Sequence, residues 1–165
     1  MNSALMFSKA SDEWETPGLL YLALDGEFDF DCDAAATCKN QTEIGYFGPD
    51  HINAEQRDAL AVADWSKYGT TFWLNPPYSR CREFIAKAAS EALTHGCTIV
   101  CLVPRRTDTR CWHAHVWDRT HHRPLPSVEI RFLKGRLKFG MPGQTVANSA
   151  PFPSVLIIFR PPAAV

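Results

Sequence analysis

Apolar runs at residues 70–74, 98–103 and 153–159 constrain the fold of this chain more than any other feature of its sequence. Runs of this length without polar alternation are typical of strands that are buried on both faces of a sheet. Between the first two runs, residues 81–95 carry an apolar stripe at helical spacing, and Gly96 ends the helix that they predict. Buried strands that alternate with helices predict an α/β fold with a mostly parallel central sheet and helices on both faces.

The shorter segments complete the expected order of elements. Thr16 is a candidate N-cap for a helix over residues 16–24, in which Pro17 occupies a position that the first turn tolerates. The other expected elements are strands at 28–33 and 44–47, helical segments at 54–63 and 109–118, and a C-terminal hairpin of residues 128–133 and 136–139 that turns at Lys134-Gly135.

Length and composition set the organisation of the chain. It has 165 residues, of which 45% are hydrophobic, so it suits one domain and is too apolar for a disordered segment. We expect a flexible N-terminus at residues 1–12 and a single domain over residues 13–165, without a large separate recognition domain. No apolar run reaches the ~18 residues of a membrane span, and no secretory signal layout is present. We therefore expect a cytoplasmic protein whose six cysteines are reduced thiols.

Charge is distributed unevenly along the chain, although the net charge is only −1. Residues 1–75 carry 4 basic and 13 acidic side chains, whereas residues 76–165 carry 13 basic and 5 acidic ones. An acidic first half suits a cationic ligand, and a basic second half suits a polyanion such as nucleic acid. A surface of mixed sign after folding is the alternative interpretation.

Polar or unusual clusters lie at the ends of four of the expected strands. They are Asp31-Cys32-Asp33, Gly48-Pro49-Asp50, Asn75-Pro76-Pro77-Tyr78 and Pro104-Arg105-Arg106. Because ligands of open α/β sheets bind at the carboxyl ends of the strands, we expect these clusters to gather at one functional edge.

The segment Asn75-Pro76-Pro77-Tyr78 is the most informative of these clusters. The lone pair of an exocyclic amine such as adenine N6 is delocalised into the ring, so the amine is a poor nucleophile. The side-chain oxygen of Asn75 and the carbonyl oxygen of Pro76 can both accept hydrogen bonds from that amine and favour a more pyramidal nitrogen. The prolines stiffen the loop, and Tyr78 offers a ring on which an extruded base can stack. The alternative is a proline-rich turn that only ends a strand.

With these residues the chain resembles the small phage- and prophage-encoded DNA N6-adenine methyltransferases, the Dam-like phage family. The resemblance covers roughly residues 13–160, and its pieces occur in a fixed order, which makes it more specific than the Asn75–Tyr78 motif alone. These pieces are Trp14-Glu15-Thr16-Pro17, Phe30-Asp31-Cys32-Asp33-Ala34, Asp64-Trp65, Asn75-Pro76-Pro77-Tyr78-Ser79, Pro104–Thr109, Gly135–Phe139 and Ala150–Ser154.

The resemblance implies a Rossmann-like methyltransferase fold and the transfer of a methyl group from S-adenosyl-L-methionine to N6 of an adenine extruded from double-stranded DNA. Many methyltransferases carry Gly-x-Gly after the first strand, but this chain, like the small phage family, lacks it and has Asp31-Cys32-Asp33-Ala34-Ala35. The implied catalytic residues are Asn75, Pro76, Pro77 and Tyr78, and the implied cofactor-binding residues are Trp14, Thr16, Pro17, Asp31, Cys32, Asp33 and Ala34. To these we add Asp50 for the ribose hydroxyls and Asp64 near the cofactor adenine, although either acid can also be ordinary turn chemistry.

The basic second half supplies candidate DNA contacts. Arg105 and Arg106 rank first, because they follow a strand at the expected functional edge. Arg136 and Lys138 rank below them, since charge on a hairpin can simply protect a sheet edge. The histidine-rich segment from Cys111 to His122 has no spacing typical of zinc, so we expect no metal.

Two alternatives to adenine methylation stay open at this stage. The same motif can act on another amine, such as cytosine N4, an RNA base or a protein glutamine. A catalytically inactive DNA-binding relative would also carry the basic half, although the intact Asn75–Tyr78 segment argues against it. We expect a monomer whose partner is double-stranded DNA and which does not associate with membranes.

Overall fold

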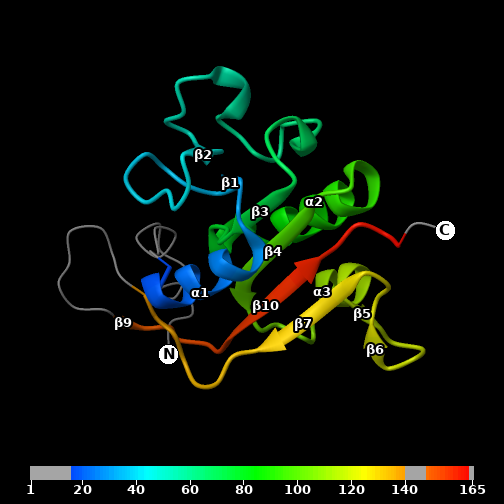
Figure 1. The fold of residues 1–165 in the computed structure, drawn as a ribbon. Coiled ribbons are helices and arrows are strands. Elements are labelled where there is room, and N and C mark those ends of the chain that lie inside the picture. The colour runs from blue at the N-terminus through cyan, green and yellow to red at the C-terminus, as the bar shows by residue number, and fades with distance from the viewer. Residues whose placement is uncertain (1–15, 140–147, 164–165) are drawn as a thin grey trace.

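The computed structural model describes residues 16–139 and 148–163, which build a six-stranded sheet in the order β2-β1-β3-β4-β10-β7 (Figure 1). Strands β2, β1, β3 and β4 pair in parallel, whereas β10 is antiparallel to both of its neighbours. The predicted α/β fold with a mostly parallel sheet is therefore confirmed. The bounds of these strands are β1 Cys32–Asp33, β2 Gly45–Tyr46, β3 Thr71–Leu74, β4 Thr98–Pro104, β7 Val128–Phe132 and β10 Ser154–Phe159.

Helices lie on both faces of this sheet, as the sequence predicts (Figure 1). Helices α2 (Cys81–His95) and α3 (Arg110–His115) cover one face, and α1 (Gly18–Phe28) covers the other. Alternate residues of β4 divide between the two layers, so Ile99 belongs to the first and Val100 to the second. The shorter elements are the 3-10 turns η3 Ala54–Gln56, η4 Trp65–Lys67 and η5 Tyr78–Arg80, and the small strand pairs β5 Trp117–Asp118 with β6 Arg123–Pro124 and β8 Lys138–Phe139 with β9 Asn148–Ser149.

The strand register brings the ends of the parallel strands to one edge. Asp33 of β1 lies opposite Trp73 of β3, and Leu74 of β3 lies opposite Cys101 of β4. Strand β7 runs in the same direction as β4, because both are antiparallel to β10. We call this side of the sheet, where β1, β2, β3, β4 and β7 end, the carboxyl edge.

The start and end of α1 differ from the prediction. Pro17, not Thr16, is the N-cap residue, and no side chain caps this end of the helix. The helix continues to Phe28, and Asp29 ends it in the left-handed region with φ 53°, where its N–H donates to the carbonyl of Asp25. The predicted strand at 28–33 is therefore wrong over most of its length, because the helix takes its first residue and only Cys32–Asp33 pair as a strand.

The predicted C-terminal hairpin is also wrong. Strand β7 pairs with β10, while β8 pairs with β9, and Gly135 turns the chain away from the sheet at φ 76°. All six residues of β10 are buried. A strand of this kind gains most apolar burial in the sheet interior, whereas residues 136–139 include two cations that favour solvent.

The two other predicted helical segments are shorter than expected. Residues 54–63 form only η3, which Asn53 caps, and turns. The side chain of Asp58 accepts the N–H of Leu60, which a continued helix would bond internally. Residues 109–118 contain α3, which Thr109 caps by accepting a hydrogen bond from the N–H of Trp112. No helix within residues 16–139 and 148–163 is long and apolar enough to cross a membrane. The predicted flexible N-terminus lies outside the described residues.

Candidate active site

The loop after β3 carries the Asn75–Tyr78 motif on the carboxyl edge. Asn75 follows the last residue of β3, Pro76 is buried, and Pro77 leads into η5 and then α2. The side-chain nitrogen Nδ2 of Asn75 donates a hydrogen bond to Oγ1 of Thr16 at 3.2 Å. Because the two ends of a carboxamide diverge from one carbon, this bond turns the acceptor oxygen Oδ1 of Asn75 away from Thr16.

Asp33 places a buried carboxylate beside this loop. Its side chain is only 3% exposed, and the residue pairs with Trp73, two positions before Asn75. One carboxylate oxygen accepts from the N–H of Ala35 at 3.2 Å, and the other accepts from the N–H and hydroxyl of Thr42 at 3.1 and 2.7 Å. Burial nevertheless raises the pKa of Asp33 to about 6. A carboxylate desolvated in this way is stabilised by a cation placed against it.

A small cavity connects these groups. It has a volume of about 40 Å³, and its lining residues are Thr16, Asp33, Ala35, Asn40, Trp73, Asn75 and Pro77. The predicted catalytic residue Asn75 and the predicted cofactor residues Thr16 and Asp33 therefore meet at one place, although they are far apart in the sequence.

Tyr78 does not line this cavity and contacts Phe152, a residue that we did not predict as part of the site. The two rings meet edge-to-face, with centroids 5.0 Å apart and an interplanar angle of 75°. Burial raises the pKa of the Tyr78 hydroxyl, so the side chain is a neutral aromatic surface at physiological pH. The only sequence signal for Phe152 is its place in the Ala150–Ser154 segment, because nothing local indicates that it lies against the loop after β3.

The four predicted DNA-binding residues follow strands that end at the carboxyl edge. Arg105 and Arg106 follow β4 and are exposed, and the N–H of Arg105 donates to the carbonyl of Pro153 at 2.9 Å. Arg136 and Lys138, also exposed, come after β7. The fold therefore collects basic side chains on the side of the sheet that carries Asn75.

Asp31 and Asp64 lie at the opposite edge of the sheet. Oδ2 of Asp31 accepts hydrogen bonds from the N–H and hydroxyl of Thr70 and from the N–H of Thr71, which tie the start of β1 to the start of β3. Partial burial opposes ionisation, but these bonds hold the pKa of Asp31 below its usual value. Asp64 caps η4 and lies near His95, at the far end of α2 from the Asn75 loop. A helix of 15 residues spans about 20 Å, so Asp64 is remote from that loop.

The remaining predicted cofactor residues differ in their positions. Cys32 and Ala34 both belong to the buried core, but Ala34 follows β1 at the carboxyl edge and donates its N–H to the carbonyl of Trp73. Asp50 lies after β2, and its carboxylate accepts the N–H of Cys38 at 2.9 Å, which joins the loops after β1 and β2. Trp14 lies outside the described residues, and Pro17 begins α1.

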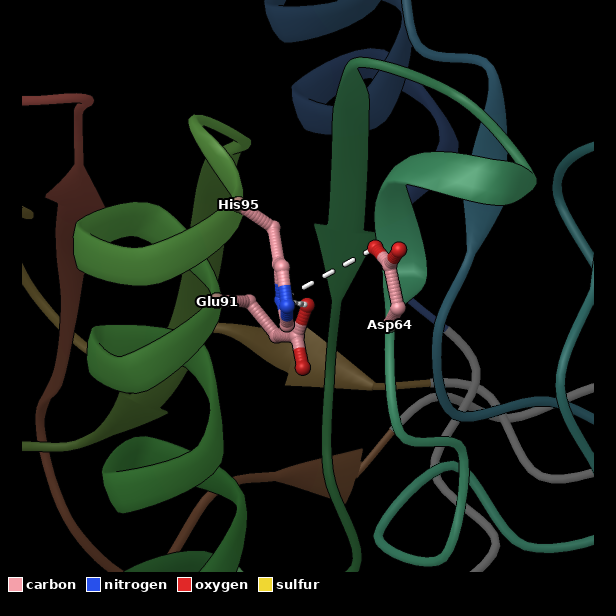
Figure 2. A group of neighbouring side chains, drawn as sticks. All are labelled: Asp64, Glu91 and His95. Carbon is pink, nitrogen blue, oxygen red and sulfur yellow. Dashed lines mark hydrogen bonds and ion pairs between the residues drawn. The ribbon is translucent and has the colours of Figure 1, made fainter.

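A group with the composition of a metal site lies at the amino edge, where the parallel strands begin (Figure 2). The potential ligand atoms of Asp64, Glu91 and His95 lie within 4.8 Å of one another. Glu91 is 1% exposed and accepts hydrogen bonds from Nζ of Lys87, from the N–H of Trp65 and from Nδ1 of His95. The protein's own donors thus satisfy this carboxylate, which links the end of α2 to η4. Among the described residues, the histidines between 113 and 122 belong to no such group.

Comparisons with known proteins identify similar chains. The sequence model of the family described as DNA N-6-adenine-methyltransferase (Dam) matches residues 4–164. A DNA N-6-adenine-methyltransferase of Haemophilus phage HP1 is 28% identical over 160 residues, covering 94% of this chain and 84% of the phage protein. A DNA N-6-adenine-methyltransferase of Escherichia phage T1 is 32% identical over 139 residues, covering 84% of this chain but only 51% of the phage protein. No solved structure matches the chain significantly.

Proposed function

The chain belongs to the DNA N-6-adenine-methyltransferase (Dam) family, and on that premise we propose that it methylates N6 of an adenine extruded from double-stranded DNA at the Asn75–Tyr78 loop. The observation that carries the location is the contact of Asn75 with Thr16 beside the buried carboxylate of Asp33, at the carboxyl edge of the sheet. This edge is where open α/β sheets bind their ligands.

Asn75 and Pro76 hold the amine that reacts. The oxygen Oδ1 of Asn75 and the carbonyl oxygen of Pro76 accept the two N–H bonds of N6, which draws the lone pair out of conjugation with the ring. Thr16 accepts a hydrogen bond from Nδ2 of Asn75, so the acceptor oxygen Oδ1 is already oriented before the base binds. No base is required before the reaction, because the N6 proton becomes acidic only when the nitrogen carries the new methyl group.

The residues at the edge of β1 fit a cationic cofactor. S-adenosyl-L-methionine supplies the methyl group from a sulfonium cation. Asp33 is a buried carboxylate whose described hydrogen-bond partners, the N–H groups of Ala35 and Thr42 and the hydroxyl of Thr42, are all neutral. We place the cofactor against Thr16, Asp33 and Ala34, with Asp50 toward the ribose. The positions of Asp31, Cys32 and Asp64 argue against contacts with the cofactor.

Tyr78 receives the extruded base. Base–aromatic stacking contributes about 1–3 kcal/mol per base, which offsets part of the cost of unstacking it from the duplex. The edge-on ring of Phe152 restricts the orientation of the Tyr78 ring. Arg105, Arg106, Arg136 and Lys138 contact the phosphates of the same duplex. We propose that the enzyme acts in the cytoplasm as a monomer.

The test is incubation with labelled S-adenosyl-L-methionine and, separately, duplex DNA, RNA and protein, followed by digestion of the labelled DNA to nucleosides. We expect label in DNA, as N6-methyladenine. Label at cytosine N4 would keep the site but overturn the adenine assignment, and label only in RNA or protein would overturn the DNA assignment.

A further inference from the structure

A second cavity lies on the other side of the Asn75–Tyr78 loop. It has a volume of about 500 Å³, within the range of ligand sites. It opens between the start of α2, the start of α3 and the end of β4. Asn75 and Pro77 face the small cavity described above, whereas Tyr78 faces this one. The complete lining comprises Tyr78, Ser79, Cys81, Arg82, Ile85, Val103, Pro104, Arg106, Thr109, Arg110, Cys111 and Trp112.

This cavity has an apolar floor and a cationic rim. The floor is built from Ile85, Val103 and Trp112, which are all buried. Arg82, Arg106 and Arg110 are exposed around it, and no lining residue is acidic. Asp108 shares a separate depression with Arg110 and does not line this cavity. Three guanidinium groups around one concave surface attract an anion.

Two of these arginines form no ion pair with any residue in 16–139 or 148–163. Among the described residues, the ion pairs of arginine side chains involve Arg80, Arg131 and Arg160, but neither Arg82 nor Arg110. Arg80, two positions before Arg82, pairs with Asp58 and Glu83. The guanidinium groups of Arg82 and Arg110 are therefore available to a ligand from solution.

We propose that this cavity holds the nucleotide next to the target adenine, with its phosphate on the guanidinium groups of Arg82, Arg106 and Arg110. The proposal rests on the proposed function, because the strand must continue on both sides of a base that stacks on Tyr78. Its neighbour then passes over the nearest concave surface with charge opposite to that of DNA.

The cavity floor discriminates little between bases. The hydroxyl of Thr109 is already engaged, since it donates to the carbonyl of Arg106 and accepts from the N–H of Trp112. Ile85 and Val103 offer surface without base-edge donors or acceptors, so we expect recognition here to rest mainly on the phosphate. The three arginines thus hold the strand in place without reading its sequence.

The experiment compares Arg82→Ala/Arg110→Ala with Arg123→Ala, which removes an exposed arginine of β6 outside this cavity. Duplex affinity is measured by fluorescence anisotropy at several salt concentrations, in the presence of S-adenosylhomocysteine so that no reaction occurs. We expect the double variant to bind about tenfold or more weakly on every flanking sequence, with a salt slope lower by up to about 1. Arg123→Ala and cofactor affinity should stay at the wild-type values.

The outcomes separate this proposal from the proposed function. Unchanged duplex affinity in the double variant overturns the cavity assignment, even if the wild-type protein methylates adenine. A loss confined to one flanking sequence overturns the phosphate role in favour of base recognition. A wild-type protein that transfers no methyl group, but whose duplex affinity still depends on Arg82 and Arg110, overturns the reaction and supports the cavity.

Discussion

At the scale of single residues, the proposed function assigns the chemical step to Asn75. Replacing it by alanine removes an acceptor that matters most as N6 becomes pyramidal, so Asn75→Ala should lower kcat by about 100-fold or more. Affinity for the cofactor should change little, because the interaction is with the amine. Steady-state kinetics and calorimetry measure the two effects separately. Methylation by Asn75→Ala at the wild-type rate would show that the active site lies elsewhere.

We propose that Thr16 positions Asn75. Thr16→Val keeps the shape of the side chain but removes the oxygen that accepts Nδ2 of Asn75. Loss of one hydrogen bond of about 1 kcal/mol should lower kcat about fivefold. Thr16→Ser retains the hydroxyl and should restore the rate. A serine variant as slow as the valine variant would mean that packing, not the hydrogen bond, explains the effect.

Asp33 and Asp31 make opposite contributions to the pH dependence of stability. Burial raises the pKa of Asp33 to about 6, so the stabilising protonated form is lost as pH rises through 6. The free energy of unfolding of the wild type, relative to that of Asp33→Asn, should therefore fall between pH 4 and pH 7, by up to ~3 kcal/mol. The pKa of Asp31 is lowered by hydrogen bonds from Thr70 and Thr71, despite partial burial, so its contribution is lost as pH falls. Urea unfolding at several pH values gives the free energy of unfolding of the wild type minus that of each asparagine variant. This difference should fall with rising pH for Asp33→Asn and rise with pH for Asp31→Asn. The same direction of change in both would contradict the assignment.

These two aspartates also show where prediction from sequence ends. The alternation of residues 28–33 predicts Asp31 and Asp33 on one face of one strand, and the family resemblance assigns both to the cofactor. The strand has only two residues, so one aspartate precedes it at the amino edge and the other ends it at the carboxyl edge. Asn75 and Tyr78 were accessible from sequence because a local motif specifies them, whereas the partners Thr16 and Phe152 come from distant segments.

At the scale of elements, strand pairing decided what local patterns could not. Residues 128–133 look like half of a hairpin, but their partner is β10, which lies more than twenty residues further along the chain. Helix α2 was predictable from its apolar stripe and from Gly96, which ends it at φ 72°. The hydrogen bonds of Glu91 that fix the C-terminal end of this helix to η4 were not predictable. A glutamate in a helix is usually expected on the exposed face, but Glu91 is only 1% exposed.

The stability of α2 should depend on that network. Glu91→Ala leaves Nζ of Lys87, the N–H of Trp65 and Nδ1 of His95 without their common acceptor, and should lower the free energy of unfolding by about 3 kcal/mol. Glu83→Ala on the same helix breaks only an exposed pair with Arg80 and should cost less than about 1 kcal/mol. Urea denaturation of the two variants compares them directly. Equal losses would contradict a structural role for the Glu91 network.

At the scale of the whole molecule, the charge asymmetry of the sequence becomes a spatial one. Residues 1–75 supply β2, β1 and β3, and residues 76–165 supply β4, β10 and β7, which form the other half of the same sheet (Figure 1). The acidic and basic halves of the chain therefore meet between β3 and β4. The Asn75 loop lies at this boundary, so a cationic cofactor and a polyanionic duplex can approach it from opposite sides.

This division predicts different salt dependences for the two ligands. If Arg105, Arg106, Arg136 and Lys138 each neutralise one phosphate, duplex affinity should fall about 100-fold between 50 and 200 mM salt, because each contact releases counterions. The cofactor displaces no comparable ion atmosphere, and its affinity should change only a few-fold over the same range. Anisotropy with labelled duplex and calorimetry with S-adenosylhomocysteine measure the two dependences. Arg136→Ala and Lys138→Ala should each lower the duplex salt slope by about 1 without changing cofactor binding. A duplex affinity that is indifferent to salt would show that the basic half of the sheet does not follow the DNA backbone.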